Sequence, residues 1–171
     1  MQKPHSQSQA GFTLIEILVV SGLSVMLMLT ISAMFMTFLL GNTTTNIRKT
    51  LNTEGNYALS QIGFILRNAI AVNSGCTGVA EPQISINSVD GGTTVFAAQD
   101  VTDPDGTTTR IASNSANLTS RDVTLVDDPT FTCTQRGTAK YVTVSFQLQH
   151  SSTSGADAIV EDFSSEILLR N

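Results

Sequence analysis

The stretch GFTLIEILVV, residues 11–20, opens the apolar part of the chain and carries a single carboxylate, that of Glu16. The apolar run continues through residues 12–40 without another charge. At about 1.5 Å per residue, a helix of this length exceeds a hydrocarbon core of about 30 Å. The run therefore predicts a membrane-embedded helix. A charge at the bilayer centre costs about 3 kcal/mol, so the Glu16 carboxylate needs a partner or a task.

A removable secretory signal is the alternative interpretation of this run. The apolar region of such a signal spans roughly 7–15 residues and ends at a small-residue cleavage site, whereas residues 12–40 form a much longer run. The flanking cations do not fix the orientation, because Lys3 precedes the run and Arg48 and Lys49 follow it. We expect a single membrane-embedded helix whose orientation must come from other evidence.

Beyond residue 40, apolar residues recur at steps of three or four, which continues the helix. They form a stripe on one face, opposite polar residues: Ile47, Leu51, Gly55, Ala58, Ile62, Ile65, Ala69 and Val72. No proline lies between Phe12 and Ala80, and residues 73–75 offer a stop. The pattern predicts one helix from Phe12 to about Val72, in which residues 41–74 are the amphipathic continuation.

From residue 75 onward the hydrophobic period changes to two. In YVTVSFQLQ, residues 141–149, apolar and polar residues alternate strictly, which predicts a strand with one buried face. Shorter candidate strands are residues 84–86, 94–97, 123–126, 131–134 and 163–169, separated by turn sequences such as Asp90-Gly91-Gly92, Asp128-Pro129 and Ser154-Gly155. The sequence therefore predicts an α+β fold. Its long N-terminal helix covers the apolar face of a small antiparallel sheet in a domain of residues 75–171.

The two cysteines, Cys76 and Cys133, both lie in this distal region. Such a pair suits an oxidising compartment and favours a disulfide over two unpaired thiols. A bond between them would be structural, because a small sheet packed on one helix has a limited core and gains stability from a cross-link.

No pattern of residues predicts catalysis. Neither His5 nor His150 has an acid or nucleophile at a recognisable spacing, so we expect no enzyme activity and no cofactor. The stretch DVTDPDG contains Asp100, Asp103 and Asp105, whose oxygens suit calcium, but a turn with solvated acids is the simpler interpretation. A net charge of −5 argues against broad nucleic-acid binding, which the sequence does not indicate.

The N-terminal motif resembles that of the type IV pilin and type II secretion pseudopilin family. The resemblance rests on a continuous stretch followed by the apolar run: Gly11, Phe12, Thr13, Leu14, Ile15 and Glu16. It implies that residues 1–11 are a leader, that a prepilin peptidase cuts between Gly11 and Phe12, and that the new amine of Phe12 is methylated. It also implies a pilin-like fold and a single-pass protein of the cytoplasmic membrane whose C-terminal domain is extracytoplasmic.

The resemblance further implies partners and a role for Glu16. The partners are the prepilin peptidase, other pilin or pseudopilin subunits, the membrane assembly platform and the lipid bilayer. The region around Ala33 lacks the proline common in major pilins, which favours a minor pilin or pseudopilin that joins or primes a filament. Glu16 would pair with the amine of Phe12, on its own chain or on a neighbouring subunit, and so set the register of assembly.

Two alternatives stay open. Glu16 lies close to the helix start, where a carboxylate at the lipid headgroups is favoured by the helix dipole alone. The whole chain is alternatively a membrane-anchored extracytoplasmic module that captures a surface, DNA or an exported protein. Filament assembly and capture are not exclusive functions.

Overall fold

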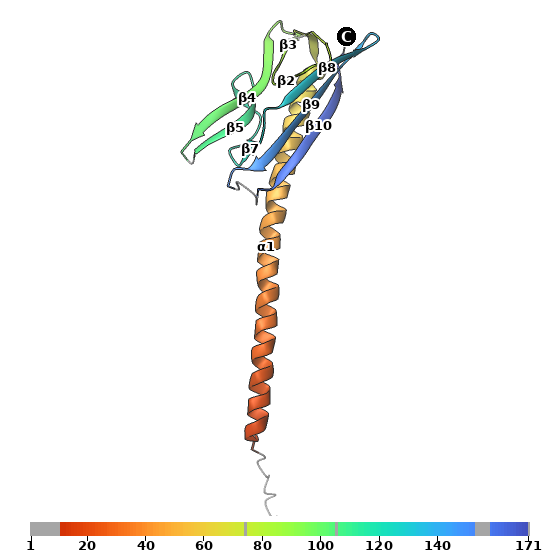
Figure 1. The fold of residues 1–171 in the computed structure, drawn as a ribbon. Helices are drawn as coiled ribbons and strands as arrows, with labels where there is room; N and C mark the ends of the chain where they lie inside the picture. Colours follow the sequence, from red (N-terminus) through yellow and green to blue (C-terminus); the bar gives the residue numbers. More distant parts are fainter. Residues whose placement is uncertain (1–10, 74, 105, 153–157, 171) are drawn as a thin grey trace, which may run out of the picture. The chain divides into compact units, whose positions relative to one another are not determined.

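The computed structural model describes residues 11–73, 75–104, 106–152 and 158–170 (Figure 1). The chain divides into two compact units, Met1–Thr44 and Thr45–Asn171, and each is described by itself. The helix α1 (Leu14–Arg67) contributes to both units, and the described strands all belong to the second. The predicted α+β class, with a long apolar N-terminal helix and antiparallel sheets, is confirmed.

The helix ends earlier than the sequence predicts. It stops at Arg67, and the expected continuation to Val72 is wrong, because Ala69–Val72 form strand β1, antiparallel to β3 (Ile84–Ser88). A short apolar run fits both periodicities. β-Branched residues such as Ile70 favour a strand, and β3 supplies backbone partners that the last turn of a helix lacks.

Two antiparallel sheets form in place of the single predicted sheet. The first sheet has the order β1-β3-β4-β5-β6, and the second has the order β10-β9-β8-β2, with β7 also paired to β9. The remaining bounds are β2 (Ala80–Glu81), β4 (Thr93–Asp103), β5 (Gly106–Ser113), β6 (Ala116–Asn117), β7 (Val123–Leu125), β8 (Thr130–Arg136), β9 (Ala139–His150) and β10 (Val160–Leu168).

The predicted strands are all present, and β9 matches its prediction in detail. Its buried residues are Val142, Val144, Phe146 and Leu148, which alternate with half-buried polar residues. The sequence missed β5 because its threonines, Thr107 to Thr109, interrupt any apolar alternation. Strands β2 and β6, of two residues each, were also not predicted. The predicted strands themselves divide between the two sheets, and side-chain alternation does not reveal which strands pair.

The second half of α1 packs lengthwise along β10. The predicted stripe is buried at Leu51, Ala58 and Ile62. Gly55 lies against the ring of Phe163, and Gly63 lies near Ile167. Eight helical residues rise about 12 Å, and four strand residues rise about 13 Å. The helix and the strand therefore advance in the same direction at matching rates.

Polar contacts fix the same alignment of α1. Arg48 near the start of this packed half forms an ion pair with Glu161 at 2.7 Å. The Glu54 carboxylate accepts a hydrogen bond from the Ser120 backbone N–H at 3.0 Å, in the loop that precedes β7. One hydrophobic core joins the helix to both sheets, with Leu66, Ile86, Phe96, Ile111, Phe131 and Ile167 among its buried residues.

A single hydroxyl joins the two sheets where β5 meets β7. The Thr109 backbone N–H donates to Thr124 Oγ1 at 3.0 Å, and the same Oγ1 lies 3.3 Å from the Thr109 carbonyl oxygen. The threonine side chain therefore satisfies both backbone groups of Thr109, as a neighbouring strand would do.

Candidate functional site

The N-terminus of α1 is capped by Thr13. The Glu16 backbone N–H lies 3.1 Å from the Thr13 carbonyl oxygen and 3.4 Å from Thr13 Oγ1. Threonine is a favoured N-cap residue, and a glutamate three positions later is the spacing of a capping box. This pattern, T-x-x-E, was visible in the sequence but was not considered there. It explains why the helix begins at Leu14 and not at the predicted Phe12.

The Glu16 carboxylate lies in the first helical turn and is exposed. Within the described residues, no hydrogen bond or ion pair reaches this carboxylate. Its predicted partner, the free amine of Phe12, does not exist in the uncleaved chain, where this nitrogen forms the peptide bond to Gly11. The positive end of the helix dipole favours its charge at this position. The geometry satisfies the backbone of Glu16 and leaves its charge available to another group.

The predicted cleavage position lies just outside the helix. Gly11 and Phe12 precede the capping residue, and both are exposed. Apart from the two chain neighbours of Gly11, no atom of the described residues lies within 4 Å of the position that a Cβ on Gly11 would occupy. A residue without a side chain in open surroundings lets a protease approach the backbone closely. The arrangement suits cleavage between Gly11 and Phe12.

The first half of α1 exposes apolar side chains on every face. All described side chains between Leu14 and Leu39 are exposed, including large residues such as Phe35. Among the described residues, α1 is the one helix long and apolar enough to cross a membrane, with a mean hydropathy of 2.4 in its most apolar window. An apolar surface of this size requires lipid or other helices around it.

Four hydroxyl groups within this apolar segment, but not that of Ser32, donate to carbonyl oxygens of the helix itself. Ser21 and Ser24 donate to the carbonyl oxygens of Leu18 and Val20, at 2.9 and 2.8 Å. Thr30 and Thr37 bond to earlier carbonyls in the same way. Because each of these four side-chain donors has an intrahelical acceptor, these residues add little desolvation cost in a hydrocarbon environment.

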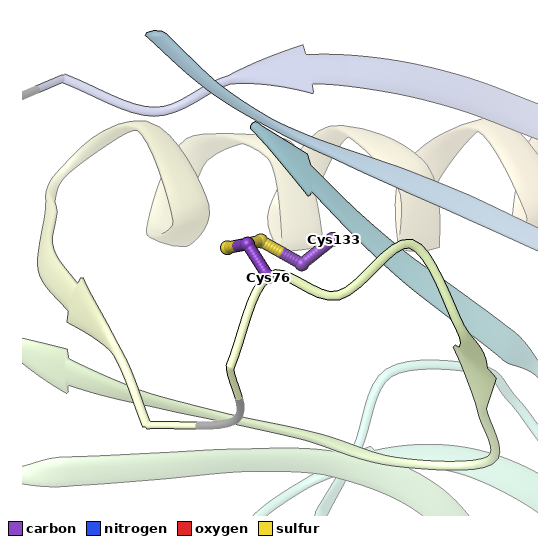
Figure 2. Close-up of a disulfide and its surroundings, with 2 residues drawn as sticks. All are labelled: Cys76 and Cys133. Atoms are coloured by element: carbon purple, nitrogen blue, oxygen red, sulfur yellow. A yellow bond between two sulfur atoms is a disulfide. The ribbon is translucent and has the colours of Figure 1, made fainter. Parts of the chain in front are cut away.

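The predicted disulfide between Cys76 and Cys133 is confirmed (Figure 2). Cys76 lies in the connection that leads from β1 to β2, and Cys133 lies in β8. Their Cα atoms are 4.5 Å apart, and the bond spans 57 residues of sequence. The Gly78 backbone N–H also donates to the Cys133 carbonyl oxygen at 2.9 Å. The bond therefore ties the chain that leaves the first sheet to the second sheet.

The structure gives the acidic residues of the β4–β5 hairpin other partners than calcium. Asp103 pairs with Arg110, whose side chain is almost fully buried. Asp100 accepts a hydrogen bond from Thr109 Oγ1 at 2.7 Å. Asp105 lies outside the described residues. Among those described, no group of three metal-ligating side chains comes together.

His150 has a neighbour that the sequence analysis missed. Its Nδ1 atom lies 2.7 Å from Ser152 Oγ and 3.3 Å from the Ser152 backbone nitrogen. These contacts join residues two positions apart at the end of β9. The pair borders a polar cavity of about 500 Å³ that is also lined by Asp103, Arg121 and Asp122. Side chains of both charge signs line this cavity.

Comparisons with known proteins identify no relative. No protein-family model matches the chain, no curated protein matches its sequence, and no solved structure matches its fold.

Proposed function

We propose that the chain is a minor pilin or pseudopilin that joins or primes a type IV pilus or a type II secretion pseudopilus. The observation that carries the proposal is that the apolar first half of α1 is exposed and capped and has, in its first turn, a carboxylate without an ionic partner among the described residues. A helix bundle in a filament covers such a surface, and the amine of a neighbouring subunit neutralises such a charge.

In this function, processing precedes assembly. A prepilin peptidase removes residues 1–11 and methylates the amine of Phe12, and the membrane assembly platform then inserts the mature chain among other subunits. The second unit lies on the extracytoplasmic side, where the Cys76–Cys133 bond is stable against reduction. Glu16 sets the register of the incoming helix and has no catalytic role.

Processing is tested by the mass of the mature chain. The protein is purified from membranes of cells that express a prepilin peptidase and from cells that lack it. We expect a chain that begins at N-methylated Phe12 in the first case and an intact leader in the second. A cut on the distal side of residues 12–40 would identify an ordinary secretory signal and contradict the proposal.

Assembly is tested at Glu16. Glu16→Gln keeps the shape of the side chain and removes its charge, so the variant should be inserted and processed but excluded from filaments. Glu16→Asp keeps the charge and should restore part of the incorporation. A membrane-anchored binding module needs no charge at this position. If the natural chain forms no filament, and Glu16→Gln reaches the membrane and captures its partner as the natural chain does, that alternative is favoured.

A further inference from the structure

Five of the described strands pair with one other strand only, and four of the five are short or interrupted. Strand β7 contains three residues. Strands β2 and β6 contain two residues each, and β1 has a register shift between Ala69 and Ala71. Strand β10 is nine residues long and pairs with β9 without a shift. It lies at the border of the second sheet in Figure 1. Its sequence contains no proline or lysine, which commonly protect exposed edges.

The register shows which backbone groups of β10 point outward. The Leu169 N–H donates to the Lys140 carbonyl oxygen at 2.9 Å, directly beyond the last paired residues. Hydrogen-bonded pairs alternate along an antiparallel ladder. The backbone groups of Asp162, Ser164 and Glu166 therefore point away from β9. Within the described chain, no backbone hydrogen bond reaches them.

Two of the exposed side chains of this edge, Asp162 and Glu166, are acidic, and the others are Val160, Ser164 and Leu168. The Asp162 carboxylate accepts a hydrogen bond from the neutral Gln147 amide at 2.6 Å, so its charge is not compensated. Glu166 forms an exposed ion pair with Arg136 at 3.1 Å. The edge therefore combines unpaired backbone groups with a net negative charge.

A second copy of β10 complements this edge less well than a strand that carries basic residues opposite both Asp162 and Glu166. An antiparallel pair centred on Ser164 places Asp162 opposite Glu166 twice. A register centred on Asp162 or on Glu166 places that residue opposite its own copy. The remaining registers within residues 160–168 place the acids opposite serine or apolar residues. Like charges directly opposite each other destabilise a strand pair. Residues 160–168 contain no basic residue, so no register within them brings opposite charges together. Arg170, two residues beyond β10, faces Asp162 in the register centred on Glu166, which opposes the two Glu166 carboxylates. It faces Glu166 in the register centred on Leu168, which leaves Asp162 without a partner.

We propose that the β10 edge binds an extended segment of a different polypeptide, which carries lysine or arginine opposite Asp162 and adds a strand to the second sheet. Backbone hydrogen bonds to Asp162, Ser164 and Glu166 provide the affinity, and the basic side chain provides the selectivity. This inference does not depend on the proposed function.

The test uses the full-length, nitrogen-labelled protein in detergent micelles and a synthetic peptide as long as β10. The peptide has valine at both ends, lysine at the third and seventh positions and threonine elsewhere, so that either orientation presents lysine to Asp162. The control peptide has glutamate in place of lysine. We expect the lysine peptide to shift the amide resonances of Asp162, Ser164 and Glu166 and to slow their hydrogen exchange about tenfold or more. The glutamate peptide should do neither.

Two variants separate strand addition from simple charge attraction. Ser164→Pro removes an outward N–H and should abolish protection by the lysine peptide, whereas Ser164→Ala keeps that N–H and should bind normally. Asp162→Lys leaves the backbone intact and should weaken binding of the lysine peptide about fivefold. This variant keeps the test valid if Ser164→Pro does not fold. No protection at millimolar peptide, equal effects of both peptides, or normal binding by Asp162→Lys would overturn the proposal.

Discussion

Phe163 packs so closely against Gly55 that a Cβ atom on Gly55 would lie 2.3 Å from the ring. The ring cannot easily withdraw, because it is buried and stacks on Phe146 with centroids 5.4 Å apart. A glycine in a helix interior costs about 1 kcal/mol relative to alanine. Here that cost allows α1 and β10 to approach each other, so Gly55 is a packing residue and not a helix breaker.

Gly55→Ala should therefore destabilise the second unit despite its better helix propensity. Overpacking costs about 1–3 kcal/mol, which exceeds the propensity gain of about 1 kcal/mol. Gly63→Ala is the matched control in the same helix, because its Cβ would lie no closer than 3.8 Å to any neighbour. Chemical denaturation of both variants, followed by near-ultraviolet circular dichroism, should show a lower free energy of unfolding for Gly55→Ala and an equal or higher one for Gly63→Ala.

The clash with Phe163 can be tested separately. Adding Phe163→Leu to Gly55→Ala removes the ring, so the double variant should lose less stability than the two single changes predict together. Strictly additive losses would show that Gly55 matters for another reason.

The sequence predicted the helix α1 and the strand β9 better than it predicted how α1 packs against the sheets. Period-two alternation in residues 141–149 predicted β9, and the helical stripe through Leu51 and Ile62 predicted the buried face of α1. Both signals are local repeats of side-chain polarity. The need for glycine at position 55 depends on Phe163, which lies more than a hundred residues away, so no local pattern revealed it.

The disulfide should contribute strongly to the stability of the second unit. For a bond that spans 57 residues, the chain-entropy relation gives about 4 kcal/mol. Replacing Cys76 and Cys133 together with alanine should lower the free energy of unfolding by about this amount. A reducing agent should destabilise the natural chain and leave the double variant unchanged. Equal stability of the oxidised chain and the variant would contradict the prediction.

The contact between β5 and β7 should weaken when Thr124 loses its hydroxyl. Thr124→Val leaves both backbone groups of Thr109 without this partner, at a cost of about 1–2 kcal/mol. Hydrogen exchange at the Thr109 amide should accelerate in Thr124→Val and stay slow in Thr124→Ser, which keeps the hydroxyl. Unchanged exchange in the valine variant would show that β5 and β7 are held together by other contacts.

Substitutions of Thr13 should separate the effect of the helix cap from the effect of the Glu16 charge. Thr13→Ala removes the side-chain acceptor for the Glu16 N–H and should accelerate exchange of that amide about fivefold, whereas Thr13→Ser should not. Because Thr13→Ala retains the Glu16 carboxylate, it should still enter filaments if the proposed function holds. Exclusion of Thr13→Ala would mean that the helix start, and not the charge, controls assembly.

The candidate site shows the same division between local and non-local information. The residues from Gly11 to Glu16 are contiguous, so a local pattern was enough to predict roles for them, and these roles stay predictions. The T-x-x-E cap in the same stretch was overlooked. The free edge of β10 was not predictable in this way. It depends on strand order, and strand order is set by which segments pair across the domain.

The parallel alignment of α1 with β10 has a mechanical consequence. Contacts from Arg48–Glu161 through Gly55–Phe163 to Gly63–Ile167 are distributed along the helix. A pull along the helix axis from Thr45 loads these contacts together, in shear, and does not peel them apart one after another. The second unit should therefore withstand far more tension along this axis than across it, as the proposed function as a filament subunit would require.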